Sequence, residues 1–240
     1  MTTAIEWTDE TWNPVAGCSA ISPGCKHCYA ARMAARLAAM GGGTGARYAG
    51  LSKPAKAGPV WTGKIRLNET ALDKPRRWRR PRRIFVNSMS DLFHKDIPRE
   101  FIDRVFETME RADRHVYQVL TKRSARLRDY ANRRYAGGTA PDHIWLGVSV
   151  EDAARTGRIR HLRDTRAGVR FVSFEPLLGP VGNVDLGDIA WAIVGGESGP
   201  GARPMRPEWA RRLRDICARD GVAFFFKQWG GHNKKRAGRA

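Results

Sequence analysis

Six short apolar runs, separated by helical stretches, constrain the fold of this 240-residue chain more than any other feature. Each run is almost continuously apolar, which is typical of a strand covered on both faces of a parallel sheet. Amphipathic stretches at 99–110, 124–132, 153–162 and 207–219 predict helices between them. The alternation predicts a single α/β domain. The runs are Ile84–Ser88, Val116–Leu120, Ile144–Val150, Val169–Phe174, Ile189–Val194 and Val222–Phe226.

Together with a further strand expected near Ile5–Thr8, these runs fit a complete or partial (β/α) barrel. A doubly wound open sheet fits less well, because no Gly-x-Gly-x-x-Gly sequence follows the first strand. We expect the barrel domain to span residues 1–231, followed by a basic flexible tail over 232–240. Glycines and prolines at 41–68 predict a long loop, which forms part of an insertion over 41–83.

Polar side chains follow every one of the six apolar runs, at residues near 88, 121, 149, 173, 195 and 227. In a parallel barrel these ends lie on one face, and that face holds the active site. A single acid there is explained equally well as a helix cap, but six polar ends in succession favour a functional face. The catalytic candidates are Asp91, Lys122, Glu151, Glu175 and Lys227.

The fifth polar end has the sequence Gly195-Gly196-Glu197. Two glycines let a ligand approach the backbone, and the adjacent acid can hold an amine. A tight turn explains the same three residues without a ligand.

Three of the four cysteines lie at positions 18, 25 and 28, within a predicted loop over 13–29. A structural zinc site takes four ligands, and an iron–sulfur cluster normally takes four as well. Three thiolates therefore leave one metal position open, since His27 lies too close to Cys28 to act as the fourth ligand. We expect Cys217 to be a buried helix residue.

The cysteines do not resemble a disulfide set, because no signal peptide precedes them. We therefore expect a cytoplasmic protein with reduced thiols, in which clustered cysteines bind metal or do redox work. No run of eighteen apolar residues predicts a membrane span, and we expect no membrane partner.

The chain has a net charge of +19, from 43 basic and 24 acidic residues. Such an excess favours polyanions, with nucleic acid first among them. The densest basic run surrounds one aromatic residue, which is typical of a surface that binds a backbone and stacks on a base. A solvated helix end before a strand explains the same run. Its nucleic-acid-binding candidates are Arg76, Arg77, Trp78, Arg79 and Arg80.

The segment Asn13-Pro-Val-Ala-Gly-Cys18, followed by Cys25 and Cys28-Tyr29, resembles the phage and prophage three-cysteine-motif family of gene products thirty-seven and sixty-eight. Asn-Ser-Met-Ser-Asp-Leu-Phe-His at 87–94, Ser-Phe-Glu-Pro-Leu-Leu-Gly-Pro at 173–180 and Phe-Lys-Gln-Trp-Gly at 226–230 are similar to its other signatures. That family in turn resembles radical S-adenosylmethionine enzymes, whose partial barrels hold a 4Fe–4S cluster on three cysteines.

The resemblance implies that Cys18, Cys25 and Cys28 ligate a 4Fe–4S cluster whose fourth iron binds S-adenosylmethionine. It also implies a reductant protein for the cluster and a partner protein with a three-cysteine motif. Two features depart from the radical enzymes: six residues separate the first two cysteines instead of three, and Gly-Gly-Glu follows a late strand. The implied cofactor-binding residues are Ser88, Ser90, Asp91, Ser173, Glu175, Gly195, Gly196 and Glu197.

Three hypotheses follow for the function. The first is a radical S-adenosylmethionine-like enzyme acting on a nucleic acid or nucleotide. The second is a non-catalytic, metal-stabilised nucleic-acid-binding phage protein. The third is a structural or regulatory phage protein whose cysteines brace a loop, which the polar strand ends disfavour.

Overall fold

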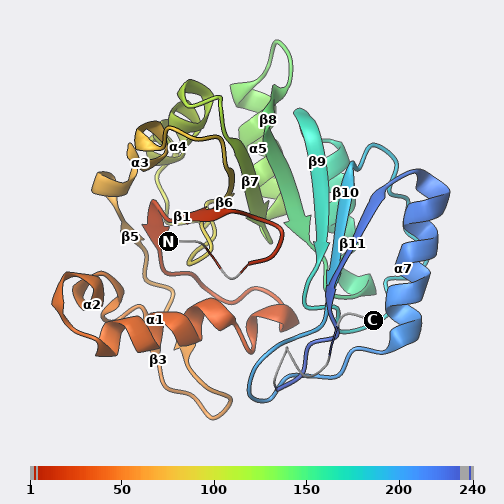
Figure 1. The fold of residues 1–240 in the computed structure, drawn as a ribbon, viewed down its shortest axis with the longest axis horizontal. Coiled ribbons are helices and arrows are strands. Elements are labelled where there is room, and N and C mark those ends of the chain that lie inside the picture. The colour runs from red at the N-terminus through yellow and green to blue at the C-terminus, as the bar shows by residue number, and fades with distance from the viewer. Residues whose placement is uncertain (1–2, 4, 233–237, 239–240) are drawn as a thin grey trace. The chain divides into compact units, whose positions relative to one another are not determined.

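A computed structural model describes residue 3, residues 5–232 and residue 238. Seven strands form one sheet in the order β1-β6-β7-β8-β9-β10-β11, so consecutive strands of the barrel are neighbours (Figure 1). The strand pairs β1–β6, β6–β7, β9–β10 and β10–β11 are parallel. The fold is an α/β fold with a seven-stranded parallel sheet, as the sequence predicts.

The sheet strands are β1 (Glu10–Trp12), β6 (Arg83–Val86), β7 (Val116–Thr121), β8 (Ala140–Ser149), β9 (Ala167–Phe174), β10 (Trp191–Gly195) and β11 (Ala223–Gln228). Two-stranded pairs are formed by β2 (Val15–Ala16) with β5 (Arg66–Leu67), and by β3 (Ser52–Lys53) with β4 (Val60–Trp61). The α-helices are α1 (Tyr29–Ala39), α2 (Gly42–Tyr48), α3 (Lys74–Arg77), α4 (Arg99–Arg111), α5 (Ser124–Arg134), α6 (Gly157–Arg163) and α7 (Pro207–Asp220). Short 3₁₀ turns are η1 (Pro23–Cys25), η2 (Glu69–Ala71) and η3 (Ala153–Arg155).

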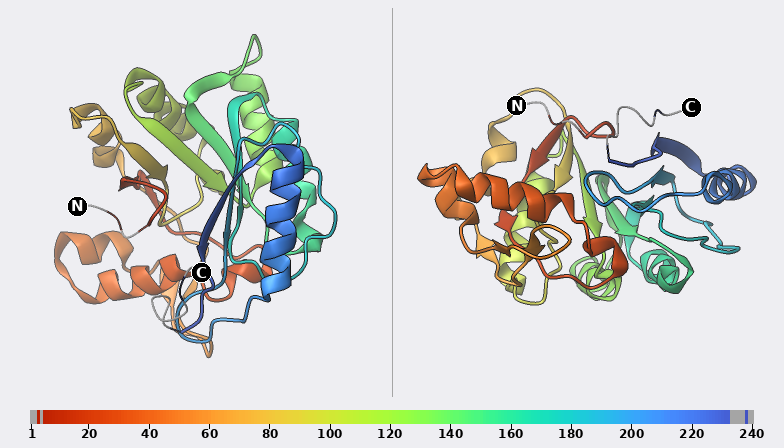
Figure 2. Two further views of the ribbon diagram at one scale, coloured as in Figure 1. Left: turned by 45° about the vertical axis from the view of Figure 1, so that its right-hand side comes forward. Right: turned by 90° about the horizontal axis from the view of Figure 1, so that it is seen from below.

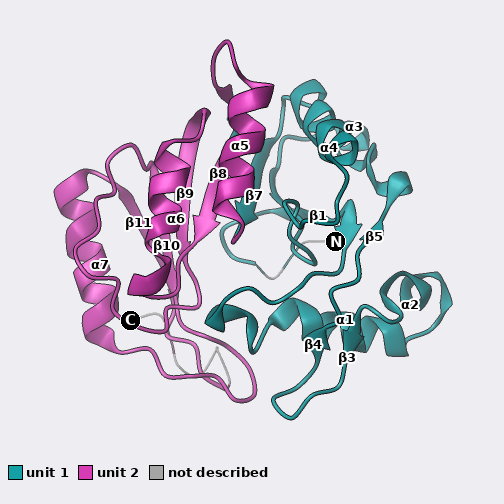
Figure 3. Ribbon diagram, turned by 180° about the vertical axis from the view of Figure 1, so that it is seen from behind, with its two compact units in different colours: residues 1–121, 141–145 teal, residues 122–140, 146–240 magenta. Residues whose placement is uncertain are grey.

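The chain divides into two compact units, which are described separately below (Figure 3). Unit 1 comprises residues 1–121 and 141–145, and unit 2 comprises residues 122–140 and 146–240. In unit 1, α1 and α2 pack together beside the β3–β4 pair. In unit 2, α7 runs alongside β10 and β11 (Figure 2). The apolar face of α7 is buried there, including Leu213, Ile216 and the predicted helix residue Cys217.

Two sequence predictions about local structure are wrong. Residues 6 and 7 form a turn, and the first strand lies later, at Glu10–Trp12, where it pairs with β6. Residues 41–68 are not a loop, because they contain α2 and three short strands. A Cβ on Gly45 would lie 3.1 Å from the carbonyl oxygen of Ala38, so glycine at this position lets α2 approach α1 closely. Packing here overrides the low helix propensity of glycine.

The predicted helix at 153–162 is also interrupted, because η3 ends at Arg155 and α6 begins at Gly157. The predicted tail at 232–240 lies mostly outside the described residues. In the described part of the chain, no helix is both long enough and apolar enough to span a membrane.

Candidate functional site

The cysteine loop begins where two asparagines join the segments that follow β1 and β6. Asn87 has a positive φ of 62°, a conformation that asparagine tolerates better than most residues. Its Oδ1 accepts from the backbone N–H of Val15 at 3.3 Å. Asn13 Oδ1 accepts from Ser88 Oγ at 3.2 Å and from the Met89 N–H at 3.0 Å. These bonds fix the strand ends from which the loop leaves.

Cys18 and Cys28 lie at the two anchored ends of the loop. Gly17 forms a parallel bridge with Ser90, and the Gly63 N–H donates to the Cys18 carbonyl oxygen at 3.2 Å. Cys28 is the N-cap of α1 and packs against a buried cluster of unit 1. Cys25 ends the 3₁₀ turn between them. None of the three cysteines is in a disulfide, and all three are partly exposed. The buried cluster consists of Ala16, Ala30, Ala34, Tyr48, Leu51 and Met89.

The three thiols do not form a preorganised metal site in this structure. Among the described residues, no three Cys, His, Asp or Glu side chains are grouped closely enough to hold a metal ion. Around the loop, Tyr29 donates its hydroxyl to the Ser88 carbonyl at 2.8 Å, and Arg32 Nη2 lies 3.3 Å from His27 Nδ1. The neighbouring side chains thus tie the loop to α1 and to the segment after β6.

The segment after β6 carries three predicted cofactor-binding residues of unit 1: Ser88, Ser90 and Asp91. Asp91 is buried, and its Oδ1 accepts from Thr121 Oγ1 at 2.6 Å and from the Phe93 N–H at 3.0 Å. The bond to Phe93 is the side-chain-to-backbone turn expected of aspartate after a strand. The buried Ser90 Oγ has no hydrogen-bond partner among the residues that the structure describes, which is unusual for an interior hydroxyl.

In unit 2, Glu151 is a fully buried carboxylate at the end of β8. Lys122 Nζ lies 3.3 Å from its Oε1, and Arg158 Nη1 lies 2.9 Å from its Oε2. Arg158 also donates to the Ser149 carbonyl at 2.7 Å, which fixes the guanidinium. The structure thus brings together two predicted catalytic candidates, Lys122 and Glu151. It adds Arg158, a cation that the sequence does not predict at this site.

At the end of β9, Glu175 accepts from Ser173 Oγ at 3.2 Å and pairs with Lys227 Nζ at 3.0 Å. These are three predicted site residues in direct contact. A Cβ on Gly195 would lie 2.6 Å from Glu175 Oε1. Glycine at this position therefore leaves room for the carboxylate.

At the end of β10, Glu197 is bound by Arg203 through three hydrogen bonds. The Arg203 N–H and Nε reach Oε2 at 3.0 and 2.9 Å, and Nη2 reaches Oε1 at 2.5 Å. The hydrogen bond to Glu197 is the main cause that raises the pKa of Arg203. Gly196 packs directly against the backbone of Trp229, where a Cβ would lie only 2.0 Å from the carbonyl oxygen. The two glycines thus allow close packing within unit 2.

The sequence alone does not single out Arg158, Arg203 or Thr121, although each contacts a predicted acid. Arg158 follows Glu151 by seven residues, which places it on the helix after the strand. That spacing is the one signal that points to the pair. Arg203 is brought back to Glu197 by a Gly- and Pro-containing turn, which has no such periodicity.

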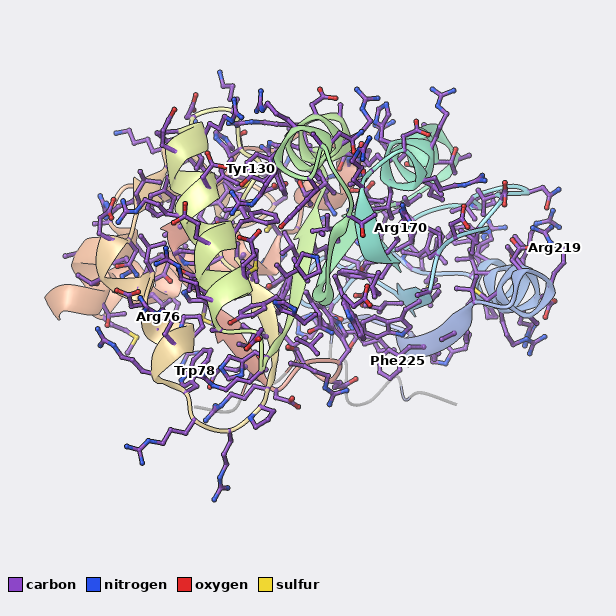
Figure 4. The ribbon with its side chains drawn as sticks, turned by 90° about the horizontal axis from the view of Figure 1, so that it is seen from above. Arg76, Trp78, Tyr130, Arg170, Arg219 and Phe225 are labelled. Carbon is purple, nitrogen blue, oxygen red and sulfur yellow. The ribbon has the colours of Figure 1, made fainter. Side chains whose placement is uncertain are left out.

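The basic run of unit 1 lies on the segment from α3 to β6 (Figure 4). Two cations lie over the Trp78 ring, with Lys74 Nζ 5.1 Å and Arg82 Cζ 5.2 Å from its centroid. Arg76 pairs with Asp73 at 3.0 Å. The arginines of the run are exposed, and its tryptophan ring already contacts two neighbouring cations. Its exposed arginines are Arg76, Arg77, Arg79 and Arg80.

Residues 2–240 match the family described as "Protein of unknown function (DUF5131)". The chain belongs to this family. No curated protein matches it. Among solved structures, it is similar to a mutant of spore photoproduct lyase, with 13% identity and a TM-score of 0.52. The likeness covers 95% of this chain and 79% of the lyase chain. At this identity it shows the fold alone, an α/β half-barrel with a seven-stranded sheet.

Proposed function

We propose that this protein is a radical S-adenosylmethionine-like enzyme that carries a 4Fe–4S cluster on Cys18, Cys25 and Cys28. The observation that carries the proposal is the position of three partly exposed cysteines, none of them in a disulfide, on one anchored loop of a half-barrel fold. Three thiolates can ligate three irons of a cubane and leave the fourth iron open.

The chemistry of the donor set fits this cluster. None of the three thiols is in a disulfide, and each is partly exposed, so iron can reach it. Only the segment 19–27 has to adjust, because the residues that anchor Cys18 and Cys28 are packed or bridged. A bound cluster with S-adenosylmethionine supplies radical chemistry, and the protein supplies binding and orientation.

The polar strand ends supply the candidate cofactor-binding groups. In unit 1, the buried Ser90 hydroxyl lacks a hydrogen-bond partner within the described part of the chain, and a bound ligand can provide one. In unit 2, Glu175 is held in one orientation by Ser173 and Lys227, and Glu197 by Arg203. Fixed carboxylates of this kind position an amine without reorganisation. The full proposed set remains Ser88, Ser90, Asp91, Ser173, Glu175, Gly195, Gly196 and Glu197.

The proposed substrate is a nucleic acid or nucleotide, which the net charge of +19 supports. A phage or prophage origin, a cytoplasmic location, a reductant protein and a three-cysteine partner protein belong to the same proposal. The alternative function is a metal-stabilised nucleic-acid-binding protein without catalysis. It is favoured by the ion pairs that already occupy Glu151 and Glu197.

Metal analysis after anaerobic purification tests the cluster. We expect about four irons with matching sulfide and a visible absorbance band, on the three-ligand cubane argument. Cys18→Ala, Cys25→Ala and Cys28→Ala should each lose them, whereas the buried Cys217→Ala is the matched control and should not. Stoichiometric zinc without iron would contradict the enzyme proposal and favour the alternative, a metal-stabilised nucleic-acid-binding protein without catalysis.

Cofactor cleavage tests the enzyme class. Reduced, iron-loaded protein should convert S-adenosylmethionine to 5′-deoxyadenosine and methionine. Glu175→Gln should lower this yield while keeping the iron, because it removes a carboxylate and no thiol. If loaded protein shows neither a spectral change with S-adenosylmethionine nor any deoxyadenosine, it is not an enzyme of this class.

A salt series tests the nucleic-acid partner. Affinity for DNA or RNA should fall steeply as salt rises, because each phosphate contact releases counterions. Replacing Arg76, Arg77, Arg79 and Arg80 together by alanine should flatten the slope. We expect Trp78→Ala to add little to that change, because Lys74 and Arg82 already stack on the ring. An unchanged slope would leave the basic run as a solvated surface.

A further inference from the structure

An open pocket of about 660 Å³ lies in unit 1 beside the cysteine loop. It is lined by Ser19, by residues 62–65 and 67, and by residues 94–96 and 98. This volume is within the range of roughly 300–1,000 Å³ that is usual for small-molecule sites. The pocket and the loop share backbone contacts, since the Gly63 N–H donates to the Cys18 carbonyl oxygen.

One wall of the pocket is a fixed polar group. His94 is fully buried, and its Nε2 lies 2.7 Å from Ser19 Oγ. Its Nδ1 accepts from the Asp96 N–H at 3.3 Å, so in this arrangement Nε2 carries the proton and donates to Ser19. The imidazole is therefore held from both sides, and Ser19 is held against the pocket by it.

The rim of the pocket is cationic. Lys64 and Lys95 are exposed, and neither forms an ion pair within the described part of the chain. Asp96 is the one acidic residue of the lining, and its Oδ2 lies 3.7 Å from His94 Nδ1. Two unpaired ammonium groups above a buried hydrogen-bonding wall suit an anionic group.

The remaining walls of the pocket are apolar. Ile65, Leu67 and Pro98 line it with hydrocarbon. A ligand that fills this pocket therefore combines a compact anionic group with a body that tolerates an apolar surface. A nucleoside phosphate has both parts, as a charged phosphate and a flat base with low charge.

We propose that this pocket binds a phosphate group attached to a nucleoside, with Lys64 and Lys95 on the phosphate and the apolar wall against the nucleoside. The phosphate comes either from a free nucleotide or from a nucleic-acid backbone. The proposal rests on the proposed function only for the choice of a nucleoside, because binding here requires no cluster. Its closeness to Cys18 places this phosphate next to the cysteine loop.

Equilibrium binding to the full-length protein at low salt tests the proposal. The probes are adenosine 5′-monophosphate, adenosine, and a short single-stranded oligonucleotide without a terminal phosphate. The monophosphate should bind more tightly than adenosine, because adenosine lacks the charged group. Tighter binding of the monophosphate than of the oligonucleotide identifies a free nucleotide as the ligand, and the reverse order identifies the backbone.

The double variant Lys64→Ala/Lys95→Ala should bind the preferred probe at least roughly tenfold more weakly, as expected for lost contacts to a charged group. The matched control is Lys53→Ala/Lys56→Ala, which removes the same charge from exposed lysines of unit 1 outside the pocket lining. It should change the affinity less than about twofold, since screened distant charges contribute little. Circular dichroism confirms that both variants fold, and Lys95→Glu alone provides a second, stronger test.

Two outcomes would overturn the proposal: none of the phosphate probes binds, or the control lysines weaken binding as much as the pocket lysines do. Iron analysis of the same variants separates this failure from that of the proposed function. If the protein binds the monophosphate but never loads iron, the proposed cluster is wrong and the proposed phosphate pocket is kept. If the protein loads iron but binds neither phosphate probe, the proposed pocket is wrong and the proposed cluster is kept.

Discussion

Replacement of Glu151 by glutamine should destabilise the protein strongly. The carboxylate is fully buried and is shared by Lys122 at 3.3 Å and Arg158 at 2.9 Å. The substitution keeps the shape but leaves two cations without their counter-charge. Loss of one partner from a buried pair costs about 3–5 kcal/mol. The side chains of Lys122 and Arg158 are 19% and 11% exposed, so partial hydration moves the expected loss to the lower end, about 3 kcal/mol.

Thermal unfolding followed by circular dichroism measures this loss. For a chain of this size, 3 kcal/mol corresponds to a fall in the melting midpoint of roughly 6–12 °C. The matched control is Glu208→Gln, whose pairing with Arg206 is 3.8 Å long and whose side chain is 61% exposed. That exposed pair should contribute about 0–1 kcal/mol. If Glu151→Gln lowers the midpoint no more than Glu208→Gln does, the argument from buried charge is wrong.

A double variant separates lost charge from lost shape at the same site. Lys122→Met should be destabilising alone, because it removes one of two cations from a buried carboxylate. Combined with Glu151→Gln, it should cost less than the sum of the two single changes, because fewer unpaired charges remain. Additive losses would mean that the pair is not coupled.

Three further outcomes are expected. Gly17→Ala should lower iron loading, because Gly17 has a φ of 95° and an added Cβ would lie 2.1 Å from the Lys64 carbonyl oxygen. Gly43→Ala is the control and should leave iron loading unchanged, because an added Cβ there would have no atom within 4 Å. Gly196→Ala should lower the unfolding free energy by about 1–3 kcal/mol in a urea titration, since its Cβ would overlap the carbonyl of the residue after β11. Burial lowers the pKa of His115, so as the pH falls the unfolded chain binds this proton at a higher pH than the folded chain does. The free energy of unfolding should therefore decrease as the pH drops below about 6.5, and His115→Gln should make that decrease less steep.

The sequence predicts the sheet well because its strands are buried on both faces. The six apolar runs correspond to β6 through β11, and their predicted ends near 121, 149 and 195 coincide with observed strand ends. Continuous apolar runs of this kind depend little on distant residues. By contrast, α2 and the short strands of residues 41–68 form only because they pack on or pair with other segments. Their local sequence carries no comparable signal.

The candidate site is predicted only in part, for a similar reason. The acids lie at strand ends, so their positions follow from the strands. Their partners do not: Arg203 reaches Glu197 through a turn, and Thr121 reaches Asp91 from the neighbouring strand, thirty residues away. The first pairing depends on the conformation of an irregular turn, and the second depends on the order of the strands in the sheet.

The anchoring of the cysteine loop has a consequence for the order in which the protein is assembled. In small zinc domains the metal supplies the folding free energy, and the chain without metal is unfolded. Here Cys28 rests on six buried residues and Cys18 follows a backbone bridge, so neither anchor depends on a bound ion. Under the proposed function, the polypeptide therefore folds first and receives iron late, and we expect the rearrangement in residues 19–27. Hydrogen exchange during reconstitution should slow in that segment and remain unchanged in α1 and β6.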